Sequence, residues 1–262
     1  MILSIVIPAH NEEKTIAQVL KQAEDVNIGQ WEKEIIVVND GSTEGTGQII
    51  SQWASLQNND AHCIALHHKT NLGKGAAIQT GLKQASGDYV IIQDADLEYD
   101  PKDIPKLLSN LSAPSDAFGG ISPQKERELQ TAVAVFPPLM RGGIKGEVAI
   151  FGARGHKAYP ERGFHYVVGA WILTAFYNLL FHQRLTDLYT GYKLIPTKIF
   201  KSLNIQSVGF EFEAEVACKL ARANVKIKEV PICYLPRNKN QGKHIGLLDA
   251  FKGFWTIIKY RI

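Results

Sequence analysis

Apolar residues in the first hundred positions form short unbroken runs that alternate with helical patterns. The runs lack polar alternation, which is typical of strands buried on both faces of a sheet, and they lie at 2–7, 35–38, 62–66 and 89–92. Apolar residues at helical spacing predict helices between them, at 12–23, 46–57 and 75–85. Asn11 is the predicted N-cap of the first helix. Strands joined by helices of this length predict βαβ units and a mostly parallel, Rossmann-like sheet in an α/β domain.

The pattern weakens after a short predicted helix at 104–111. Residues 113–147 are rich in proline and glycine and are predicted to form an irregular insertion with a short helix near 124–133. Regular patterns return further along the chain and predict strands at 148–151 and 225–230 and helices at 164–181 and 212–223. His165 and Asn178 interrupt the apolar segment 164–181, which is shorter than the ~20 residues of a membrane span. A core helix or a membrane-surface helix is therefore favoured there over a transmembrane one.

Composition restricts the function classes. The chain has 262 residues, of which 45% are hydrophobic and 21% are charged, and these values are typical of a soluble globular protein. The net charge of +3 is too small to indicate a nucleic-acid-binding protein. Three widely spaced cysteines favour a reducing compartment over a disulfide framework or a zinc site. The apolar N-terminal run ends at Pro8 and follows no basic region, so we expect a strand there and no signal peptide.

Acidic side chains follow two of the predicted strands. Asp40 comes after the strand at 35–38, and Asp94 and Asp96 come after the strand at 89–92. Ligands of parallel sheets bind beyond the carboxyl ends of the strands, where a carboxylate can contact a base or a ribose. Two carboxylates separated by one residue can hold a hard divalent cation that bridges a diphosphate. Each of these acids alone is also compatible with a simple turn, because Asp, Asn and Gly favour turns for local reasons.

Four segments occur in order, each at or near the end of a predicted strand. They are Pro-Ala-His-Asn-Glu-Glu at 8–13, Val-Asn-Asp-Gly-Ser-Thr at 38–43, Asn-Leu-Gly-Lys-Gly-Ala at 71–76 and Asp-Ala-Asp-Leu-Glu at 94–98. Together they resemble the family 2 glycosyltransferases of GT-A fold, and within these the dolichol-phosphate mannose synthase and polyprenyl-phosphate glycosyltransferase group. Segments 151–154, 185–193, 209–213 and 237–243 extend the resemblance to nearly the whole chain. The insertion at 113–147 is longer than this group usually has.

The resemblance implies a GT-A domain over residues 1–235 with a nucleotide pocket at the ends of its first strands. Pro8, Ala9 and Glu12 are expected to line this pocket, with Asp40 on the base or ribose. Lys74 is expected beside the donor, in a Gly-Lys-Gly turn suited to a close backbone approach. An exposed turn lysine is the alternative interpretation of Lys74.

A metal site is also implied by the resemblance. Asp94 and Asp96 are expected to flank the donor diphosphate and to bind Mg²⁺ or Mn²⁺, with Asp96 as the firmest ligand and a catalytic residue. Glu98 is a third candidate ligand, at a position where relatives often carry Gln. The histidines show no metal-binding spacing and are predicted to lie in loops or in packing positions, with His10 near the donor.

Three cations are candidates for binding phosphate groups: Arg154, Arg237 and Lys243. The planar guanidinium of arginine matches phosphate oxygens and keeps its charge, although each of the three could equally be a solvated surface cation. Asp187 is the candidate catalytic acid near the reaction centre. Because the second pKa of a phosphate monoester is about 6, a phosphate acceptor is already ionised at neutral pH. Asp187 therefore either acts as a base or positions the acceptor or a cation.

The C-terminal segment 236–262 has the character of a membrane-surface helix. The segment contains six lysines and arginines but a single acid, Asp249, and large apolar side chains recur at helical spacing between 247 and 258. A basic face beside an apolar, aromatic stripe is typical of interfacial helices, although a helix packed on the core shows a similar pattern. We expect a peripheral protein on the cytosolic face of a membrane, alone or with a membrane-anchored partner subunit.

The expected function is transfer of a hexose, mannose or glucose, from GDP-mannose or a UDP-hexose to dolichyl or undecaprenyl phosphate, with inversion. One alternative is a glycosyltransferase that acts on a soluble or cell-envelope glycan. Another is a non-catalytic nucleotide-sugar-binding subunit, which has less need of the Asp94 and Asp96 pair. A sugar nucleotidyltransferase is disfavoured because no glycine-rich triphosphate loop lies near the N-terminus.

Overall fold

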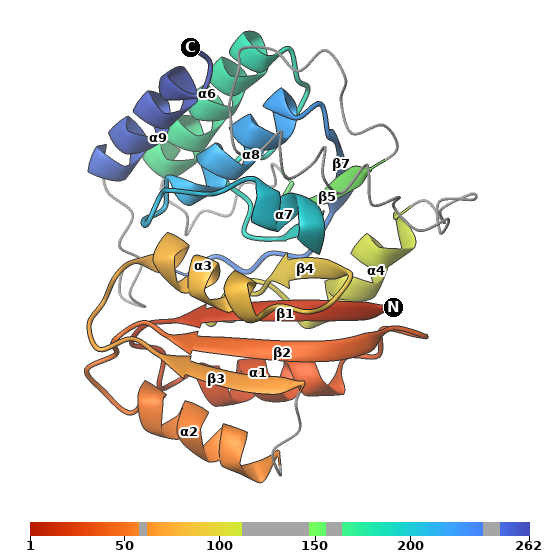
Figure 1. Cartoon of the computed structure of the whole chain (residues 1–262). Helices are drawn as coiled ribbons and strands as arrows, with labels where there is room; N and C mark the ends of the chain where they lie inside the picture. Colours follow the sequence, from red (N-terminus) through yellow and green to blue (C-terminus); the bar gives the residue numbers. More distant parts are fainter. Residues whose placement is uncertain (58–61, 112–146, 156–163, 238–246) are drawn as a thin grey trace.

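A seven-stranded sheet runs through the molecule in the order β3-β2-β1-β4-β6-β5-β7 (Figure 1). The computed structural model describes residues 1–57, 62–111, 147–155, 164–237 and 247–262. Among the seven strands of the described sheet, only β6 is antiparallel to its neighbours, so the predicted mostly parallel α/β sheet is confirmed. The strands are β1 (Ile2–Ala9), β2 (Glu32–Asn39), β3 (Cys63–His67), β4 (Tyr89–Ile92), β5 (Val148–Ala153), β6 (Lys193–Pro196) and β7 (Lys226–Pro231).

The helices largely follow the predicted positions. They are α1 (Ile16–Asp25), α2 (Thr46–Leu56), α3 (Lys74–Gln84), α4 (Ile104–Ser109) after the 3₁₀ turn η1 (Pro101–Asp103), α6 (Phe164–Phe181), α7 (Thr197–Ser202), α8 (Phe212–Arg222) and α9 (Leu247–Lys259). The sequence pattern missed β6 and α7, which are short. The insertion at 113–147, with its predicted helix near 124–133, lies outside the described residues except for Glu147.

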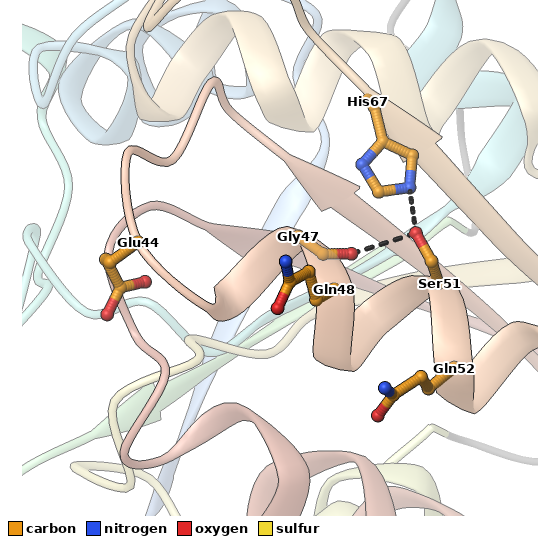
Figure 2. A pocket seen from close by; sticks show the side chains of 6 residues that line it. All are labelled: Glu44, Gly47, Gln48, Ser51, Gln52 and His67. Atoms are coloured by element: carbon orange, nitrogen blue, oxygen red, sulfur yellow. Dashed lines mark hydrogen bonds between the residues drawn. The ribbon is translucent and has the colours of Figure 1, made fainter.

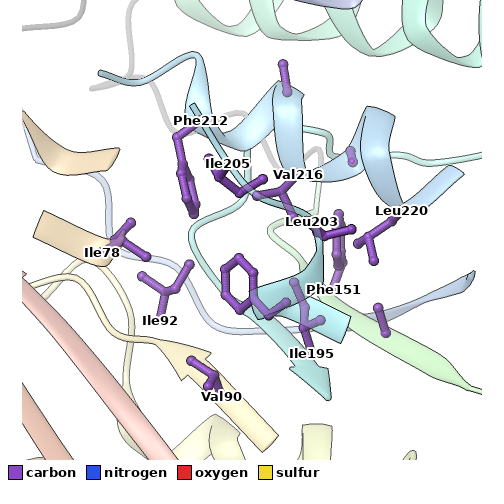
Figure 3. Packing of buried hydrophobic residues seen from close by; sticks show 14 of the residues in the cluster. Ile78, Val90, Ile92, Phe151, Ile195, Leu203, Ile205, Phe212, Val216 and Leu220 are labelled. Atoms are coloured by element: carbon purple, nitrogen blue, oxygen red, sulfur yellow. The ribbon is translucent and has the colours of Figure 1, made fainter. Parts of the chain in front are cut away.

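Apolar residues on both faces of the strands create two cores. On β1, Ile5 and Ile7 point towards α1, α2 and α4, whereas Val6 points towards α3 and the helices α6 to α9. Figure 3 shows the second of these cores, where Phe151 of β5 and Phe212 of α8 pack among the branched side chains of neighbouring elements. Burial of each such side chain stabilises the fold by about 1.5–3 kcal/mol. Strands covered on both faces explain the unbroken apolar runs in the sequence.

The first helix begins at Ile16 rather than at residue 12, and the prediction that Asn11 caps it is wrong. Asn11 has a φ of 54°, in the left-handed region, and its side-chain oxygen accepts a hydrogen bond from the amide of Thr43 at 2.9 Å. The amide of Glu12 donates to the hydroxyl of Thr46 at 2.8 Å. These bonds tie residues 11 and 12 to the loop after β2, so tertiary contacts override the local capping preference.

Helices α6, α8 and α9 pack together at one end of the molecule (Figure 1). Phe176 of α6 stacks on Phe254 of α9 with ring centroids 4.5 Å apart, and Ile257 of α9 is fully buried. The outer surface of this helix group exposes large apolar side chains, namely Trp171, Ile172 and Leu179 of α6 and Leu248, Phe251 and Trp255 of α9. Within the described ranges, no helix has both the length and the apolar content to cross a bilayer.

Candidate active site

A cavity of about 1020 Å³ lies at the carboxyl ends of β1, β2, β4 and β5. Charged residues from the loops after these strands line one part of it, and residues of α6 and α9 line the other. Eleven of the twelve predicted site residues line this cavity: Pro8, Ala9, Glu12, Asp40, Lys74, Asp94, Asp96, Glu98, Arg154, Asp187 and Arg237. The twelfth, Lys243, lies outside the described residues. Residues up to 229 positions apart in sequence thus meet in one cavity.

Asp40 fixes the loop that leads into α3. Its carboxylate accepts hydrogen bonds from the amides of Leu72 at 2.9 Å and Gly73 at 2.8 Å, and it lies 2.7 Å from the ring nitrogen Nδ1 of His68. The residue is only 2% exposed. Its backbone oxygen also lies 2.8 Å from Nδ1 of His10, which places this histidine in the cavity lining. The predicted contact of Asp40 with a base or ribose stays a prediction, since both carboxylate oxygens already have protein partners.

The Gly-Lys-Gly turn brings α3 close to the chain's own backbone. Gly73 has a φ of 102°, and a Cβ there would lie 2.4 Å from the carbonyl oxygen of Val208. At Gly75 a Cβ would lie 2.4 Å from the carbonyl oxygen of Ser207, and the Gly75 amide donates to Val208 at 2.8 Å. The close approach that the glycines allow in this structure is therefore to residues 207–208, where the sequence interpretation expected the donor.

Lys74 itself faces the cavity. Its ammonium lies 2.7 Å from Oδ1 of Asp94 and 3.2 Å from Oε1 of Glu213. Burial lowers the pKa of Lys74, but the charges of Asp94 and Glu213 outweigh it and raise the pKa above its usual range. Lys74 is thus a fixed, permanently charged cation beside Asp94 rather than an exposed turn lysine.

Arg237 lies between two acids on the opposite side of the Asp-x-Asp segment. Its Nη2 is 2.7 Å from Oδ2 of Asp96, and its Nη1 is 3.0 Å from Oε1 of Glu12. The pKa of Asp96 is nevertheless raised to about 7, because the group is buried and lies near the charges of Asp94 and Glu98. Arg237 therefore does not fully offset the burial and the neighbouring acids that act on Asp96.

Two of the three predicted metal ligands are suited to bind a divalent cation. Asp94 and Asp96 offer hard carboxylate oxygens towards the cavity. Glu98 fits less well, because it is only 8% exposed and its oxygens accept from the Tyr234 hydroxyl at 2.5 Å and the Arg237 amide at 2.7 Å. Asp96 also has protein partners, the Arg237 guanidinium at 2.7 Å and the Glu98 amide at 3.1 Å, and a cation there would share its oxygens with them. In the part of the chain that the structure describes, no three acidic, histidine or cysteine side chains form a ready-made metal cluster. Two carboxylates suffice for Mg²⁺ when substrate phosphates complete the shell.

Arg154 and Asp187 form a bidentate pair. Nε of Arg154 donates to Oδ2 of Asp187 at 2.6 Å, and Nη2 donates to Oδ1 at 2.7 Å. The guanidinium also lies 5.1 Å from the ring centroid of Tyr234. Burial raises the pKa of Asp187, but the charge of Arg154 outweighs it, so the pKa lies below its usual value. An ionised carboxylate held by two hydrogen bonds from arginine is a weak base and a good positioning group.

Sequence reasoning missed several residues of the cavity. Glu213, which contacts Lys74, lies in the Gly-Phe-Glu-Phe-Glu segment at 209–213, and the sequence predicted no individual role for it. Tyr99 accepts a hydrogen bond from the Gly191 amide at 2.8 Å and stacks on Tyr192 with centroids 4.8 Å apart. The position of Tyr99 next to Glu98 was the available signal. These contacts join the Asp-x-Asp segment to the loop that carries Asp187.

A second hollow, of about 500 Å³, lies against α2 and contains a serine and a histidine (Figure 2). The oxygen of Asn39 accepts from the Ser42 amide at 3.1 Å, so its NH₂ group faces Nδ1 of His67 at 3.2 Å. Nδ1 is then the acceptor and Nε2 carries the proton towards the Ser51 hydroxyl, 3.4 Å away. In this tautomer His67 donates towards the Ser51 hydroxyl rather than accepting its proton.

Residues 4–145, more than half of the chain, match the family model described as glycosyl transferase family 2. The chain belongs to glycosyl transferase family 2. This membership confirms the family to which the sequence segments pointed.

Relatives and solved structures agree with this family. The chain is 28% identical over 265 residues to the low-salt glycan biosynthesis hexosyltransferase Agl6 of Haloferax volcanii, covering 99% of the chain and 53% of Agl6. It is 36% identical over 118 residues to the undecaprenyl-phosphate 4-deoxy-4-formamido-L-arabinose transferase of Proteus mirabilis, covering 45% of the chain and 36% of that protein. The chain thus spans about half and about a third of these two relatives.

The fold matches glucosyl-3-phosphoglycerate synthase from Mycobacterium tuberculosis. The complex with UDP superposes with a TM-score of 0.63 at 19% identity, covering 99% of this chain and 79% of the synthase. A complex of that enzyme with Mn²⁺, UDP and phosphoglyceric acid gives a TM-score of 0.62 at 18% identity. The GT-A fold predicted from the sequence is therefore confirmed.

Proposed function

We propose that this family 2 chain moves a hexose from a nucleotide-diphosphate sugar to a polyprenyl phosphate at a membrane surface. One observation carries the proposal: a single cavity joins a charged part at the carboxyl ends of the strands to an apolar part between α6 and α9. A nucleotide sugar needs the first part, and a lipid phosphate needs both. The undecaprenyl-phosphate substrate in the name of the Proteus mirabilis relative supports this choice of acceptor.

The donor diphosphate is proposed to bind between Lys74 and Arg237, next to Asp94 and Asp96. Both cations lie within 2.7 Å of one of these carboxylates, so they are already fixed before the donor arrives. Asp94 and Asp96 would hold Mg²⁺ or Mn²⁺ without Glu98. Such a cation offsets the charge that develops on the departing nucleoside diphosphate. Four carboxylates, those of Glu12, Asp94, Asp96 and Glu98, line this part of the cavity against the two cations Lys74 and Arg237, which supports a need for further positive charge here.

The acceptor phosphate is proposed to bind near Arg154. Its oxygen attacks the anomeric carbon and forms the new glycosidic bond while the bond from that carbon to the nucleoside diphosphate breaks. The acceptor is already ionised at neutral pH, so no base has to remove a proton. Asp187, held by Arg154 through two hydrogen bonds, then serves as a positioning group. The apolar chain of the acceptor would follow Val167, Ala170 and Leu173 of α6 towards the surface.

The exposed apolar side chains of α6 and α9 are proposed to insert into the bilayer interface. Trp171 is 62% exposed, Phe251 68% and Trp255 59%, and these elements also line the cavity through Trp171 and Ala250. Lys252 and Lys259 on α9 would lie near anionic headgroups. The cytosolic face is proposed because all three cysteines are free thiols. Docking on a membrane-anchored partner subunit is the alternative that a vesicle-binding test decides.

The test is label transfer into the organic phase. The protein is incubated with Mn²⁺, undecaprenyl or dolichyl phosphate, and labelled GDP-mannose or UDP-glucose in separate reactions, with Asp96→Asn as the control. We expect extractable label from one donor and its loss in the variant. Label that appears only in water-soluble product, with a glycan acceptor, would favour the alternative of a soluble or cell-envelope glycan. Donor binding without any transfer would favour a non-catalytic subunit.

A further inference from the structure

A buried lysine outside the cavity is connected to the proposed donor site. Lys193, the first residue of β6, has no exposed surface and does not line the cavity. Its ammonium donates to the carbonyl oxygen of Leu188 at 3.3 Å, to that of Thr190, and to Oε2 of Glu213. It also lies 4.9 Å from the ring centroid of Phe151. Every polar contact of this ammonium is therefore with the protein interior.

Glu213 links Lys193 to Lys74 in the cavity. Its second oxygen, Oε1, lies 3.2 Å from the ammonium of Lys74, which in turn lies 2.7 Å from Oδ1 of Asp94. Four alternating charges thus run from the core to the cavity, in the order Lys193, Glu213, Lys74 and Asp94. Glu213 is the central member, because one carboxylate orients both lysines.

A buried ion pair contributes little net stability to a fold. Removing two charges from water costs several kcal/mol, and well-packed apolar residues often serve stability equally well. Without Lys193, the Glu213 carboxylate would be buried with Lys74 as its remaining charged partner and would pull Lys74 away from Asp94. The arrangement is therefore explained better by the placement of Lys74 than by stability alone.

Helix α8 contains a second buried lysine–glutamate pair that serves as an internal comparison. Lys219 lies 2.6 Å from Oε1 of Glu215, donates to the carbonyl oxygen of Asn204 at 2.7 Å, and lies 4.9 Å from the ring centroid of Tyr260. It thus resembles Lys193 in its acid, its carbonyl and its aromatic ring. Neither Lys219 nor Glu215 lines the cavity.

We propose that Lys193 is a positioning residue for the donor diphosphate: through Glu213 it holds Lys74 beside Asp94. This inference rests on the proposed function, since it assumes that the charged part of the cavity binds a nucleoside diphosphate. Lys193 touches no substrate and acts only through Glu213 and Lys74.

The experiment compares nucleotide binding by Lys193→Met and by the matched control Lys219→Met. Calorimetry with UDP and GDP in the presence of Mn²⁺ measures the affinity for the diphosphate, and UMP and GMP measure binding without the β-phosphate. We expect Lys193→Met to bind the preferred diphosphate about tenfold more weakly, the size of a lost charge-assisted hydrogen bond. Its affinity for the monophosphate, and both affinities of Lys219→Met, should stay within about twofold of wild type. Equal diphosphate affinities in the two variants would overturn the inference.

A double-mutant cycle tests whether Lys193 acts through Lys74. If it does, Lys74→Met with Lys193→Met binds the diphosphate no more weakly than Lys74→Met alone. Additive losses would overturn the inference. If Lys193→Met does not fold, Glu213→Gln, which can accept from only one of the two lysines, should show the same selective loss. Wild-type protein that binds neither UDP nor GDP removes the proposed function, and this inference with it. Wild-type binding with an unaffected Lys193→Met removes the inference alone.

Discussion

Gly253 allows α9 to pack against the loop that carries Asp187, and Gly253→Ala tests this packing. A Cβ at this position would lie 1.8 Å from the hydroxyl oxygen of Tyr189 and 3.1 Å from its Cζ. Real Cβ atoms essentially never approach closer than 3.0 Å, so Tyr189 or α9 must move by about 1 Å. Glycine to alanine within a helix normally stabilises by about 1 kcal/mol. Here overpacking costs about 1–3 kcal/mol and reverses the sign.

The net expectation is a loss of up to about 2 kcal/mol of unfolding free energy, or roughly 4–8 °C in Tm at about 2–4 °C per kcal/mol. Gly169→Ala in α6 is the matched control, because a Cβ there meets no atom within 4 Å. This control should gain about 1 kcal/mol. Thermal and urea unfolding of both variants measure the difference.

A second-site change identifies the responsible atom. The Tyr189 hydroxyl is buried and has no hydrogen-bond partner among the residues with described positions. Adding Tyr189→Phe to Gly253→Ala should therefore restore most of the lost stability, because the oxygen at 1.8 Å is removed. If Gly253→Ala proves as stabilising as Gly169→Ala, then α9 does not sit against Tyr189 and the shape described for the cavity is wrong.

Three further predictions concern charge, metal and membrane. The pKa of Asp187 is depressed below 3.8, so the ionised carboxylate stabilises the fold above about pH 4, and this stabilisation is lost as the pH falls through the pKa of the folded state. Urea titrations between pH 2 and 5 should therefore show a smaller loss of unfolding free energy for Asp187→Asn than for wild type. Chelation by EDTA should abolish transfer, and Mn²⁺ or Mg²⁺ should restore it in wild type but not in Asp96→Asn; full activity in EDTA would contradict the proposed cation. Leu248 of α9 and Leu56 of α2 are both 77% exposed, and we expect Leu248→Glu, but not Leu56→Glu, to reduce sedimentation with anionic vesicles about tenfold or more. Equal sedimentation of the two variants would remove α9 as the membrane contact.

Most of the sheet could be predicted because β1, β2 and β4 are buried on both faces, which leaves unbroken apolar runs in the sequence. β6 has four residues, as β4 has, but it could not be predicted because only Leu194 and Ile195 are apolar between its first residue, Lys193, and Pro196. The charged partner of this buried lysine is Glu213 of α8, twenty positions later in the sequence. A contact between distant segments leaves no periodic signal.

The candidate site was predictable in its membership and less so in its contacts. Acids at the ends of parallel strands must share one edge of the sheet, so Asp40, Asp94 and Asp96 meet as expected. The sequence could not indicate that both oxygens of Glu98 have protein donors, since one of these donors, Tyr234, lies 136 residues away. The N-cap predicted at Asn11 failed for the same reason, because its partner Thr43 belongs to another loop.

Hexose transfer to a polyprenyl phosphate is tested most directly by mass spectrometry of the lipid. Undecaprenyl or dolichyl phosphate is incubated with the protein, Mn²⁺ and unlabelled GDP-mannose or UDP-glucose, and the mass of the extracted lipid is measured. Transfer to the lipid predicts a new species heavier by one hexose residue, absent with Asp96→Asn. An unchanged lipid together with full binding of the donor would contradict transfer to a polyprenyl phosphate.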